Sequence, residues 1–437
     1  AGPAGLSAAY YLATRGYKPT VFEKSARPGG MMTYGIPSFK LEKTVIDAEI
    51  QVLRELGVEI RCGVEVGRDV TIPQLREQGF LAFYIAIGCQ GGRLPGVPGE
   101  HAAGTDIAVH FLHEALADEN QHMDGRVVVI GGGNVAVDCA RTAVRFGAEA
   151  VSMVCLESRD TMPASKDEIA EAEEEHIEIH TGWGPKELLQ DESGHVTAVV
   201  FKKCLRTIDP ETGKFAPVYD EAETITLPAD HVVFAIGQAI EWGGLLKDTK
   251  VTFHRGNYPV ADPLTYQTAE ADIFVGGDVY HGPKFVIDAI EEGKCAAESL
   301  HRYVHKGASL TIGRNRRDFV MLDKENFSVN CYDHATRQTE AVDPAVEAHS
   351  FRDARKTLTS EQVQTETARC LGCGASWVDP NKCIGCGVCT TKCVFDAIHL
   401  KRDHPECSTM MKAEDKLKGI ASMACKRLGQ TLRGRKD

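Results

Sequence analysis

Two glycine-rich segments constrain the fold of this 437-residue chain most strongly. The first contains Gly2 and Gly5, and a β-branched strand after it ends at Glu23, roughly 20 residues downstream. In such dinucleotide sites the glycines admit the pyrophosphate, the helix N-terminus supplies free N–H groups and the acid binds a ribose hydroxyl. Because the segment reads as the second half of a G-x-G-x-x-G loop, we expect a strand and a further glycine ahead of Ala1.

The second glycine-rich segment is complete. An apolar strand over 126–130 leads into a G-x-G-x-x-A loop, an amphipathic helix runs through Arg145, and a strand over 150–157 ends at Glu157. One such motif alone is compatible with an ordinary strand-to-helix turn, but two copies, each with helix, strand and acid, predict two dinucleotide sites. The loop residues expected at the second site are Gly131, Gly133, Asn134 and Ala136.

Charge and apolar patterning exclude two classes of partner. The chain has 49 Lys and Arg against 62 Asp and Glu, a net charge of −13, whereas a protein that neutralises phosphates needs a basic face. We therefore expect no nucleic-acid partner. No apolar run approaches the roughly 18 residues of a membrane span. Bunched rather than paired cysteines favour metal binding in a reducing compartment, so we expect a cytoplasmic location.

The cysteine-rich C-terminal part carries a ferredoxin-type motif. Cysteines 383, 386, 389 and 393 form C-x2-C-x2-C-x3-C. Three thiolates at this spacing bind one cubane cluster, and the fourth cysteine binds another cluster in two-cluster ferredoxins. Gly385 and Gly387 suit a tight turn of the backbone around the cluster. Val394 stands where ferredoxins usually have proline, which affects details of the fold rather than ligation.

Additional cysteines are sufficient for a second cluster. The predicted ligands of two 4Fe-4S clusters are Cys370, Cys373, Cys383, Cys386, Cys389, Cys393, Cys407 and Cys425. Either Cys407 or Cys425 is equally compatible with an ordinary buried thiol. Tetrahedral zinc is the competing interpretation of paired C-x2-C motifs, but the x2-x2-x3 spacing favours iron–sulfur.

As a set, several stretches resemble the small-subunit-type glutamate synthase flavoproteins, which are similar to the large subunit of the electron-bifurcating NADH-dependent ferredoxin:NADP oxidoreductase. They are residues 2–5, 28–37, 131–141, 162–164 and 276–278 with the following helix. The resemblance covers about residues 1–305. It implies an α/β fold with a discontinuous Rossmann-like FAD domain over 1–105 and 245–305 and an inserted Rossmann-like NAD(P) domain over 106–244. Beyond the resemblance, a charged stretch without clear periodicity predicts a connector over 306–369, and the cysteine motifs predict a ferredoxin-like domain over 370–437.

The resemblance also assigns nucleotides to residues. FAD belongs to the first motif and NAD(P)H to the second. The implied FAD-binding residues are Gly2, Gly5, Glu23, Gly30, Met31, Gly277 and Asp278. NADP-using relatives carry an Arg-Arg pair shortly before the Met-Pro, and here Leu156-Glu157 stands in that place. A carboxylate repels a 2′-phosphate, so Glu157 favours NAD, although Arg159 is still able to pair with NADP.

The scattered cysteines, the acidic stretch and His281 are expected to have structural rather than functional roles. The remaining cysteines are expected to be small core hydrophobes. No C-x-x-C precedes Cys370, which disfavours thioredoxin-reductase chemistry. The acidic stretch 168–178 is expected to be a solvated helix face, His281 a loop residue, and 360–369 a helix that ends the connector.

The pattern as a whole predicts a flavin and iron–sulfur electron-transfer subunit that exchanges hydride with NAD(P)H at FAD and single electrons with 4Fe-4S clusters. We expect it to serve other redox subunits of a larger complex, with ferredoxin or a second flavoprotein among the candidate partners and electron bifurcation as one role that the resemblance allows. Three alternatives stay open: a glutamate synthase small subunit feeding a glutaminase-bearing partner, a stand-alone reductase, and a non-catalytic scaffold with structural metal. No acid–base residue is required.

Overall fold

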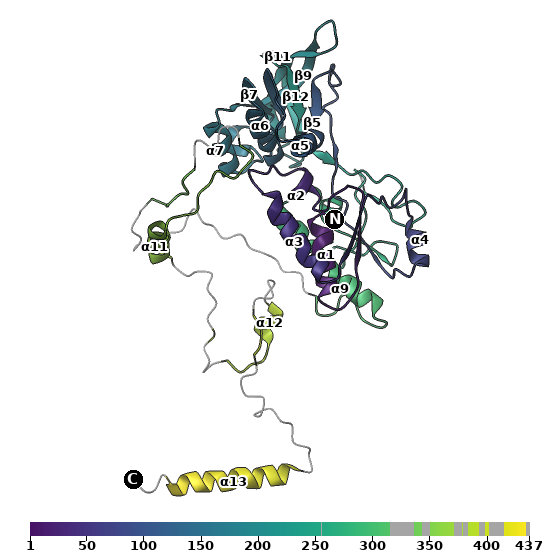
Figure 1. The fold of residues 1–437 in the computed structure, drawn as a ribbon, viewed down its shortest axis with the longest axis vertical. Coiled ribbons are helices and arrows are strands. Elements are labelled where there is room, and N and C mark those ends of the chain that lie inside the picture. The colour runs from purple at the N-terminus through teal and green to yellow at the C-terminus, as the bar shows by residue number, and fades with distance from the viewer. Residues whose placement is uncertain are drawn as a thin grey trace. The chain divides into compact units, whose positions relative to one another are not determined.

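The computed structural model describes residues 1–254, 256–314, 336–342, 350–370, 378, 383–392, 398–401 and 415–433 (Figure 1). The chain divides into two compact units, residues 1–365 and 366–437. Each unit is considered by itself below. No helix among the described residues is long and apolar enough to cross a membrane.

A five-stranded parallel sheet forms the centre of one half of the first unit. Its strand order is β5 (Thr105–Ile107), β12 (His231–Phe234), β6 (Arg126–Ile130), β7 (Ala150–Cys155) and β8 (Glu178–Thr181). Helices α5 (Ala108–Ala117), α6 (Asn134–Arg145) and α7 (Lys166–Glu174) belong to this half. The apolar run in β6 is buried throughout, as expected for a parallel strand covered on both faces.

The two faces of this sheet have different partners. Val127 and Val129 of β6 pack with the helix layer, whereas Val128 and Ile130 pack with an antiparallel sheet. That second sheet has the order β11 (Phe215–Pro228), β10 (Val196–Ile208), β9 (Trp183–Gln190) and is drawn at the top of Figure 1. The period-two alternation of side chains along β6 therefore builds two hydrophobic layers.

The other half of the first unit contains two separate parallel strand pairs. The pairs are β1 (Thr20–Glu23) with β2 (Glu59–Cys62), and β3 (Phe83–Ile85) with β14 (Ile273–Val275). Its helices are α1 (Pro3–Ala13), α2 (Met31–Tyr34), α3 (Lys43–Glu55), α4 (Ile72–Glu77), α8 (Asp278–His281) and α9 (Val286–Val304). A short antiparallel pair, β4 (Gly91–Gly92) with β13 (Gln238–Ala239), joins the two segments that connect the halves.

Helices α1 and α9 are far apart in the sequence and pack directly on each other (Figure 1). A Cβ atom at Gly293 of α9 would lie 2.2 Å from the carbonyl oxygen of Ala4, so only glycine fits at this crossing. The Ser7 hydroxyl donates a hydrogen bond to the carbonyl of Ile290 at 2.7 Å. Residues 3–13 and 286–304 thus belong to the same structural half.

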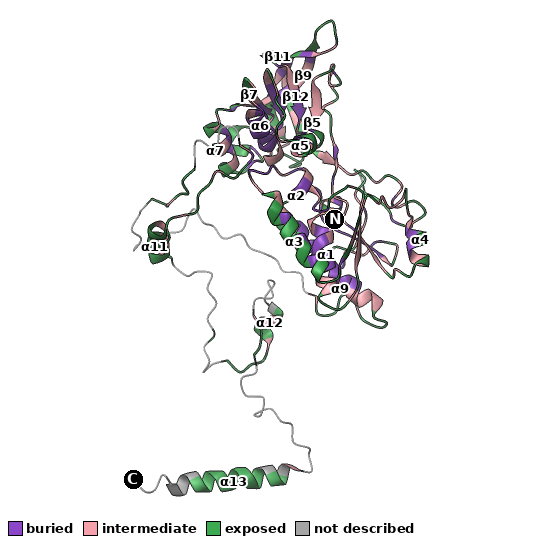
Figure 2. Ribbon diagram, in the orientation of Figure 1, coloured by how far each residue is buried: buried purple, intermediate pink, exposed green. Residues whose placement is uncertain are grey.

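The regular elements described in the second unit are helices. Its helices are α12 (Val388–Lys392) and α13 (Lys416–Arg433), and α11 (Ser360–Ala368) spans the boundary between the units. None of the side chains whose burial is described in 366–437 is buried (Figure 2). The α/β class is confirmed for the first unit, and the helix expected at the end of the connector is present as α11.

Candidate functional site

Both glycine motifs open into one cavity of ≈ 1640 Å³ in the first unit. Residues of β1 and β3 and Leu300 of α9 also line this cavity. The candidate ligand region is therefore defined by the predicted site residues that line the cavity and not by its total volume. The predicted site residues that line the cavity are Gly2, Gly5, Glu23, Gly30, Met31, Gly131, Gly133, Asn134, Glu157, Gly277 and Asp278. The fold therefore brings two sets of residues, distant in sequence, to the same space.

Two glycines form a close backbone contact at the first motif. Gly2 is the N-cap of α1 and has no side-chain cap, which leaves the free N–H groups of the helix for another acceptor. Gly30 has a φ of 57°, and a Cβ there would lie 2.7 Å from the Cα of Gly2. The missing side chains let a ligand approach the backbone here, which fits the pyrophosphate of a dinucleotide.

Glu23 ends β1 at the wall of the same cavity. Its carboxylate accepts a hydrogen bond from the backbone N–H of Ser25 at 2.8 Å. An ionised acceptor at this position suits a ribose hydroxyl.

A buried acid positions the turn after β14. Glu292 of α9 accepts a hydrogen bond from the N–H of Gly277 at 2.5 Å and contacts Nδ1 of His281 at 2.6 Å. The interpretation of His281 as a simple loop residue is wrong, because it lies in α8 and pairs with this carboxylate. Burial, together with the neighbouring carboxylates, raises the pKa of Asp278 to about 6.

The second motif leaves its helix terminus accessible. Gly133 is the N-cap of α6 without a side-chain cap, and a Cβ there would meet no atom within 4 Å. A Cβ at Gly131 would lie 2.4 Å from the carbonyl oxygen of Ala235. The side-chain oxygen of Asn134 accepts a hydrogen bond from the N–H of Ser165 at 2.9 Å. Ala136 does not line the cavity: it is completely buried in the core, so its role in the structure is packing.

Of the two charged residues after β7, Glu157 lines the cavity and Arg159 does not. A Cβ at Gly132 would lie 3.1 Å from a carboxylate oxygen of Glu157, so that carboxylate lies beside the glycine loop. Arg159 does not line the cavity and forms an ion pair with Glu173 at 2.7 Å. The negative group, and not the positive one, therefore faces the candidate nucleotide site.

A charged cluster joins the two halves at the cavity wall. The first half of the unit is the one that carries the first glycine motif, and the second half is the one that carries the five-stranded sheet. Lys40, from the first half, forms ion pairs with Asp138 of α6 and Glu168 of α7, and all three residues line the cavity. The neighbouring Phe39 is buried in the core of the second half. No sequence pattern indicated this joint, because Lys40 is more than 90 residues from both of its partners and the three residues follow no motif.

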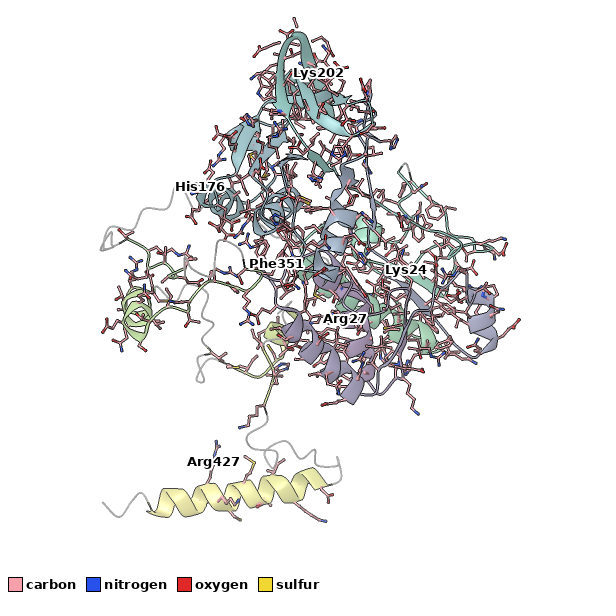
Figure 3. All side chains as sticks on the ribbon, turned by 45° about the horizontal axis from the view of Figure 1, so that its top comes forward. Lys24, Arg27, His176, Lys202, Phe351 and Arg427 are labelled. Atoms are coloured by element: carbon pink, nitrogen blue, oxygen red, sulfur yellow. The ribbon has the colours of Figure 1, made fainter. Side chains whose placement is uncertain are left out.

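Two arginines of α6 extend the joint toward the connector. Arg145 lies 3.8 Å from the centroid of the Phe39 ring and donates to the carbonyl of Ser350 at 3.0 Å, next to the buried Phe351 labelled in Figure 3. Glu175 accepts hydrogen bonds from both Arg141 and Arg145 at 2.7 Å. The expected solvated face over 168–178 is therefore wrong for Glu175, whose side chain is 5% exposed.

The protonation of Glu175 reflects this environment. Burial alone would raise its pKa, but the hydrogen bonds from Arg145 and Arg141 outweigh burial and lower it. The carboxylate thus stays ionised between two guanidinium groups. This arrangement satisfies the buried charges of α6 and holds α7 against it.

The cysteine motif has a backbone suited to ligation. Gly385 and Gly387 have φ angles of 67° and 78°, a region that favours glycine, and Cys383, Cys386 and Cys389 are exposed. Among the described residues, however, no three His, Cys, Asp or Glu side chains converge as a metal site. The donor type and the turns fit an iron–sulfur cluster, while the convergence of the thiols is not seen.

Of the other predicted cysteine ligands, two are exposed and three lie outside the described residues. Cys370 and Cys425 are exposed, so the alternative of a buried thiol does not hold for Cys425. Cys373, Cys393 and Cys407 lie outside the described residues. In the first unit, Cys89, Cys139, Cys155 and Cys204 are buried as expected, whereas Cys62 and Cys295 are only partly buried. Cys331 also lies outside the described residues.

Two family models match the chain. The pyridine nucleotide-disulphide oxidoreductase model matches residues 1–293, and the 4Fe-4S binding domain model matches residues 376–399. The second match contains the C-x2-C-x2-C-x3-C run and confirms the iron–sulfur interpretation over zinc. It covers one such motif, so it supports a 4Fe-4S domain without fixing the number of clusters.

Relatives and solved structures agree with these matches. The chain is 36% identical over 382 residues to the NADP(+)-dependent formate dehydrogenase subunit beta of Moorella thermoacetica, covering 85% of this chain and 53% of the relative. It is 36% identical over 321 residues to a glutamate synthase [NADPH] small chain of Halomonas elongata, covering 70% of this chain and 66% of the relative. The structure of Mycobacterium tuberculosis FprA in complex with NADPH shares the fold, with a TM-score of 0.59, 17% identity, and coverage of 70% of this chain and 83% of that one.

Proposed function

Because the chain belongs to the pyridine nucleotide-disulphide oxidoreductase family and is an FAD- and NAD(P)-dependent oxidoreductase with a 4Fe-4S domain, we propose that it works as an electron-transfer subunit of a larger redox complex. The single observation that carries this proposal is the shared cavity of the two glycine motifs. Hydride transfer needs the reacting atoms about 3–3.5 Å apart, and two nucleotides that enter one cavity from opposite sides are able to meet at that distance.

The residues of each half have distinct proposed roles. In the first half, Gly2 and Gly30 admit the FAD pyrophosphate, Glu23 binds a ribose hydroxyl and Asp278 contacts the ribityl-phosphate arm. In the second half, Gly131 and Gly133 expose the N-terminus of α6 to the NAD(P) pyrophosphate. When bound, FAD supplies the chemistry that links two-electron exchange with a nicotinamide to one-electron exchange with iron–sulfur clusters.

The joint between the halves sets their relative position. Lys40 holds α6 and α7 through Asp138 and Glu168 at the cavity wall. Asp138 is buried, which raises its pKa, while the ammonium of Lys40 opposes that effect. We propose that these residues fix the approach of the nicotinamide side to the flavin side and take no part in proton transfer.

The nucleotide is proposed to be NAD. Both relatives described above are named for NADP or NADPH. In this chain, however, Glu157 lies beside the glycine loop and Arg159 is paired with Glu173 away from the cavity. A carboxylate at this place accepts a hydrogen bond from a ribose 2′-hydroxyl and repels a 2′-phosphate.

Two 4Fe-4S clusters are proposed for the C-terminal part. Cys383, Cys386 and Cys389 would bind one cluster together with one further cysteine, and Cys393 would bind the other with Cys370 and Cys373. Cys407 and Cys425 are the candidates that complete the two sets. Eight thiols are enough for two clusters, and the x2-x2-x3 run is the observation that supports this arrangement.

Partners follow from the relatives and are proposals. The chain spans about half the length of the formate dehydrogenase subunit and about two thirds of the glutamate synthase small chain. We propose that it passes electrons to other redox subunits in the cytoplasm, with a ferredoxin or a second flavoprotein as the acceptor. Electron bifurcation is a specific version of this role.

The test is an anaerobic titration of the full chain with NADH and, separately, NADPH. Flavin absorbance would report FAD reduction, and low-temperature EPR would report reduced 4Fe-4S clusters. We expect bleaching with NADH at lower concentration than with NADPH, followed by cluster signals. Bleaching without cluster signals, in protein with a full iron content, would favour bifurcation. No bleaching with either nucleotide would contradict the proposal and favour a scaffold role.

A second candidate is a glutamate synthase small subunit, supported by the relative from Halomonas elongata. The C-terminal 4Fe-4S match at 376–399 lies beyond residues 1–305, which carry the motifs that resemble that family. Reduction of the clusters by NADH without a glutaminase-bearing partner would favour the first candidate. Glutamine-dependent oxidation of the reduced protein by such a partner would favour the second.

A further inference from the structure

The antiparallel sheet supplies a wall of the cavity that neither glycine motif explains. Six of its residues line the same cavity as Glu157: Trp183, Pro185, Lys202, Phe215, Pro217 and Tyr219. They come from all three strands β9, β10 and β11. Figure 3 labels Lys202 on this sheet. The wall is therefore built from segments more than 45 residues beyond the glycine loop, where no nucleotide motif is found.

Close packing holds this wall against the end of β7. The N–H of Gly182 donates a hydrogen bond to the carbonyl of Glu157 at 2.9 Å. A Cβ at Gly184 would lie 2.6 Å from the ring of Tyr219 and 2.7 Å from the side chain of Leu156. The sheet thus contacts the segment that carries the proposed ribose acceptor, without a space between them.

The wall combines aromatic rings with a positioned cation. The Lys202 ammonium lies 4.5 Å from the centroid of the Tyr219 ring and forms an ion pair with Glu221 at 2.7 Å. Tyr219 is half-buried, and burial raises the pKa of its phenol, so the ring stays neutral. Such rings pack on the faces of nucleobases, and a lysine beside them pairs with ribose or phosphate oxygens.

The order in which the parts of the dinucleotide follow one another along the cavity indicates which part reaches this wall. In the proposed function, on which this step rests, the nicotinamide must point to the FAD half and the pyrophosphate must lie at Gly131 and Gly133. The adenosine end then extends past Glu157 in the opposite direction. We propose that the β9–β11 sheet binds the adenosine end of the dinucleotide, with Tyr219 packed on the adenine ring and Lys202 contacting the oxygens of its ribose.

The test compares a whole dinucleotide with a truncated one. Reduced nicotinamide mononucleotide, NMNH, carries the reacting ring without adenosine. Full-length protein with bound FAD is assayed anaerobically for turnover, with NADH, NADPH or NMNH as the hydride donor and ferricyanide as the oxidant that reoxidises the flavin. We expect Tyr219→Ala and Lys202→Ala each to raise KM for the preferred dinucleotide about 10-fold, with kcat unchanged, because stacking and charge contacts act in binding. The rate with NMNH should not change.

Matched controls separate the wall from the rest of the sheet. Lys186 pairs with the same Glu221 at 3.9 Å but does not line the cavity, so Lys186→Ala should keep the KM of the wild type. Tyr219→Phe keeps the ring and should also retain near-normal KM. Where an alanine variant folds poorly, Lys202→Gln and the inhibition constant of adenosine 5′-monophosphate, which should rise by a similar factor, provide a second measurement.

The outcomes distinguish this inference from the proposed function. Unchanged KM in both alanine variants would overturn the adenosine site and leave the oxidoreductase function intact. An equal loss of rate with NADH and NMNH would also overturn it, because the sheet would then act through the overall structure. Failure of the wild type to be reduced by any of the three donors would overturn the proposed function and this inference together.

Discussion

The cysteines of the two units behave in opposite ways. In the first unit, Cys139 and Cys155 are buried, and burial raises the pKa of Cys155 to about 12. In the second unit, Cys383, Cys386 and Cys389 are exposed around two glycines with positive φ. A buried neutral thiol packs as a small hydrophobe, whereas an accessible thiol is able to lose its proton to a metal. The surroundings, and not the residue type, decide the role.

The two units also differ in what stabilises them. Among its described residues, the first unit has four apolar clusters, and both faces of its parallel sheet are packed. In the second unit, none of the side chains whose burial is described is buried. A small metal-binding domain is commonly ordered by its metal, because the binding free energy becomes folding free energy. We therefore expect the second unit to depend on its clusters and the first to be independent of them.

The largest effect should come from a cluster ligand. Cys386→Ser should remove at least one cluster, with about half or more of the bound iron lost, because the thiolate is the only donor of its kind at that place in the motif. Iron analysis and EPR measure this loss, and FAD content should stay unchanged. Cys139→Ser is the matched control and should keep all the iron while lowering stability. Equal iron in the two variants would remove the distinction between the units.

The next effect concerns the buried charges of the first unit. Glu175→Gln should lower the free energy of unfolding by about 3 kcal/mol, since it leaves Arg141 and Arg145 buried without their carboxylate. The pKa of Glu175 is lowered in the folded state, so its contribution is present above the unfolded value near 4.3 and is lost as the pH falls through the folded value. Denaturant unfolding at several pH values measures both.

The exposed Glu174 provides the control for this prediction. Glu174→Gln should change the free energy of unfolding by less than about 0.5 kcal/mol. The wild type should lose more stability than Glu175→Gln between pH 5 and 3. A variant at position 175 as stable as the control would show that the two arginines do not depend on that carboxylate.

A third prediction uses one substitution in both units. Gly293→Ala should destabilise the first unit by about 1–3 kcal/mol, because its Cβ would meet the carbonyl oxygen of Ala4 at 2.2 Å. Gly429→Ala in α13 should instead favour the helix by about 0.5–1 kcal/mol, since no atom lies within 4 Å of its Cβ position. Thermal unfolding and circular dichroism measure the two effects. Destabilisation at both positions would mean that α13 packs as tightly as α9.

The smallest effect is expected at the surface of the first unit. Hydrogen bonds from the side chain and backbone of Arg126 lower the pKa of Asp230 to about 2. Because the pair is more than a third exposed, Asp230→Asn should cost only about 0.5–1 kcal/mol at pH 7. The folded pKa is depressed, so this cost should shrink as the pH falls below about 4 toward 2. A cost that is constant with pH would indicate lost packing rather than lost charge.

Much of the candidate site could be predicted because nucleotide binding by a helix terminus is a local property. Gly2, Gly30 and Gly133 act through backbone conformation and missing side chains, which a short motif specifies. The buried strand β6 follows in the same way from its continuous apolar run. The family and the 4Fe-4S domain that these motifs predicted are confirmed by the matches at 1–293 and 376–399.

The residues that the sequence did not reveal act through distant partners. Glu292 reaches the N–H of Gly277, Lys40 reaches α6 and α7, and Tyr219 reaches the cavity only because the antiparallel sheet packs on the end of β7. Periodicity and motif spacing report on neighbours along the chain. An ion pair between residues more than 90 positions apart leaves no such trace.

The sequence by itself determined the two glycine loops, their strand and helix context and the cysteine run, because each depends on the local conformation of a few consecutive residues. The tertiary structure alone decided that both loops face one cavity, that Glu157 rather than Arg159 lines it, and that Ala136 and Glu175 are buried. Burial and charge pairing depend on which distant surfaces the hydrophobic core brings together, and that choice is made only when the whole first unit folds.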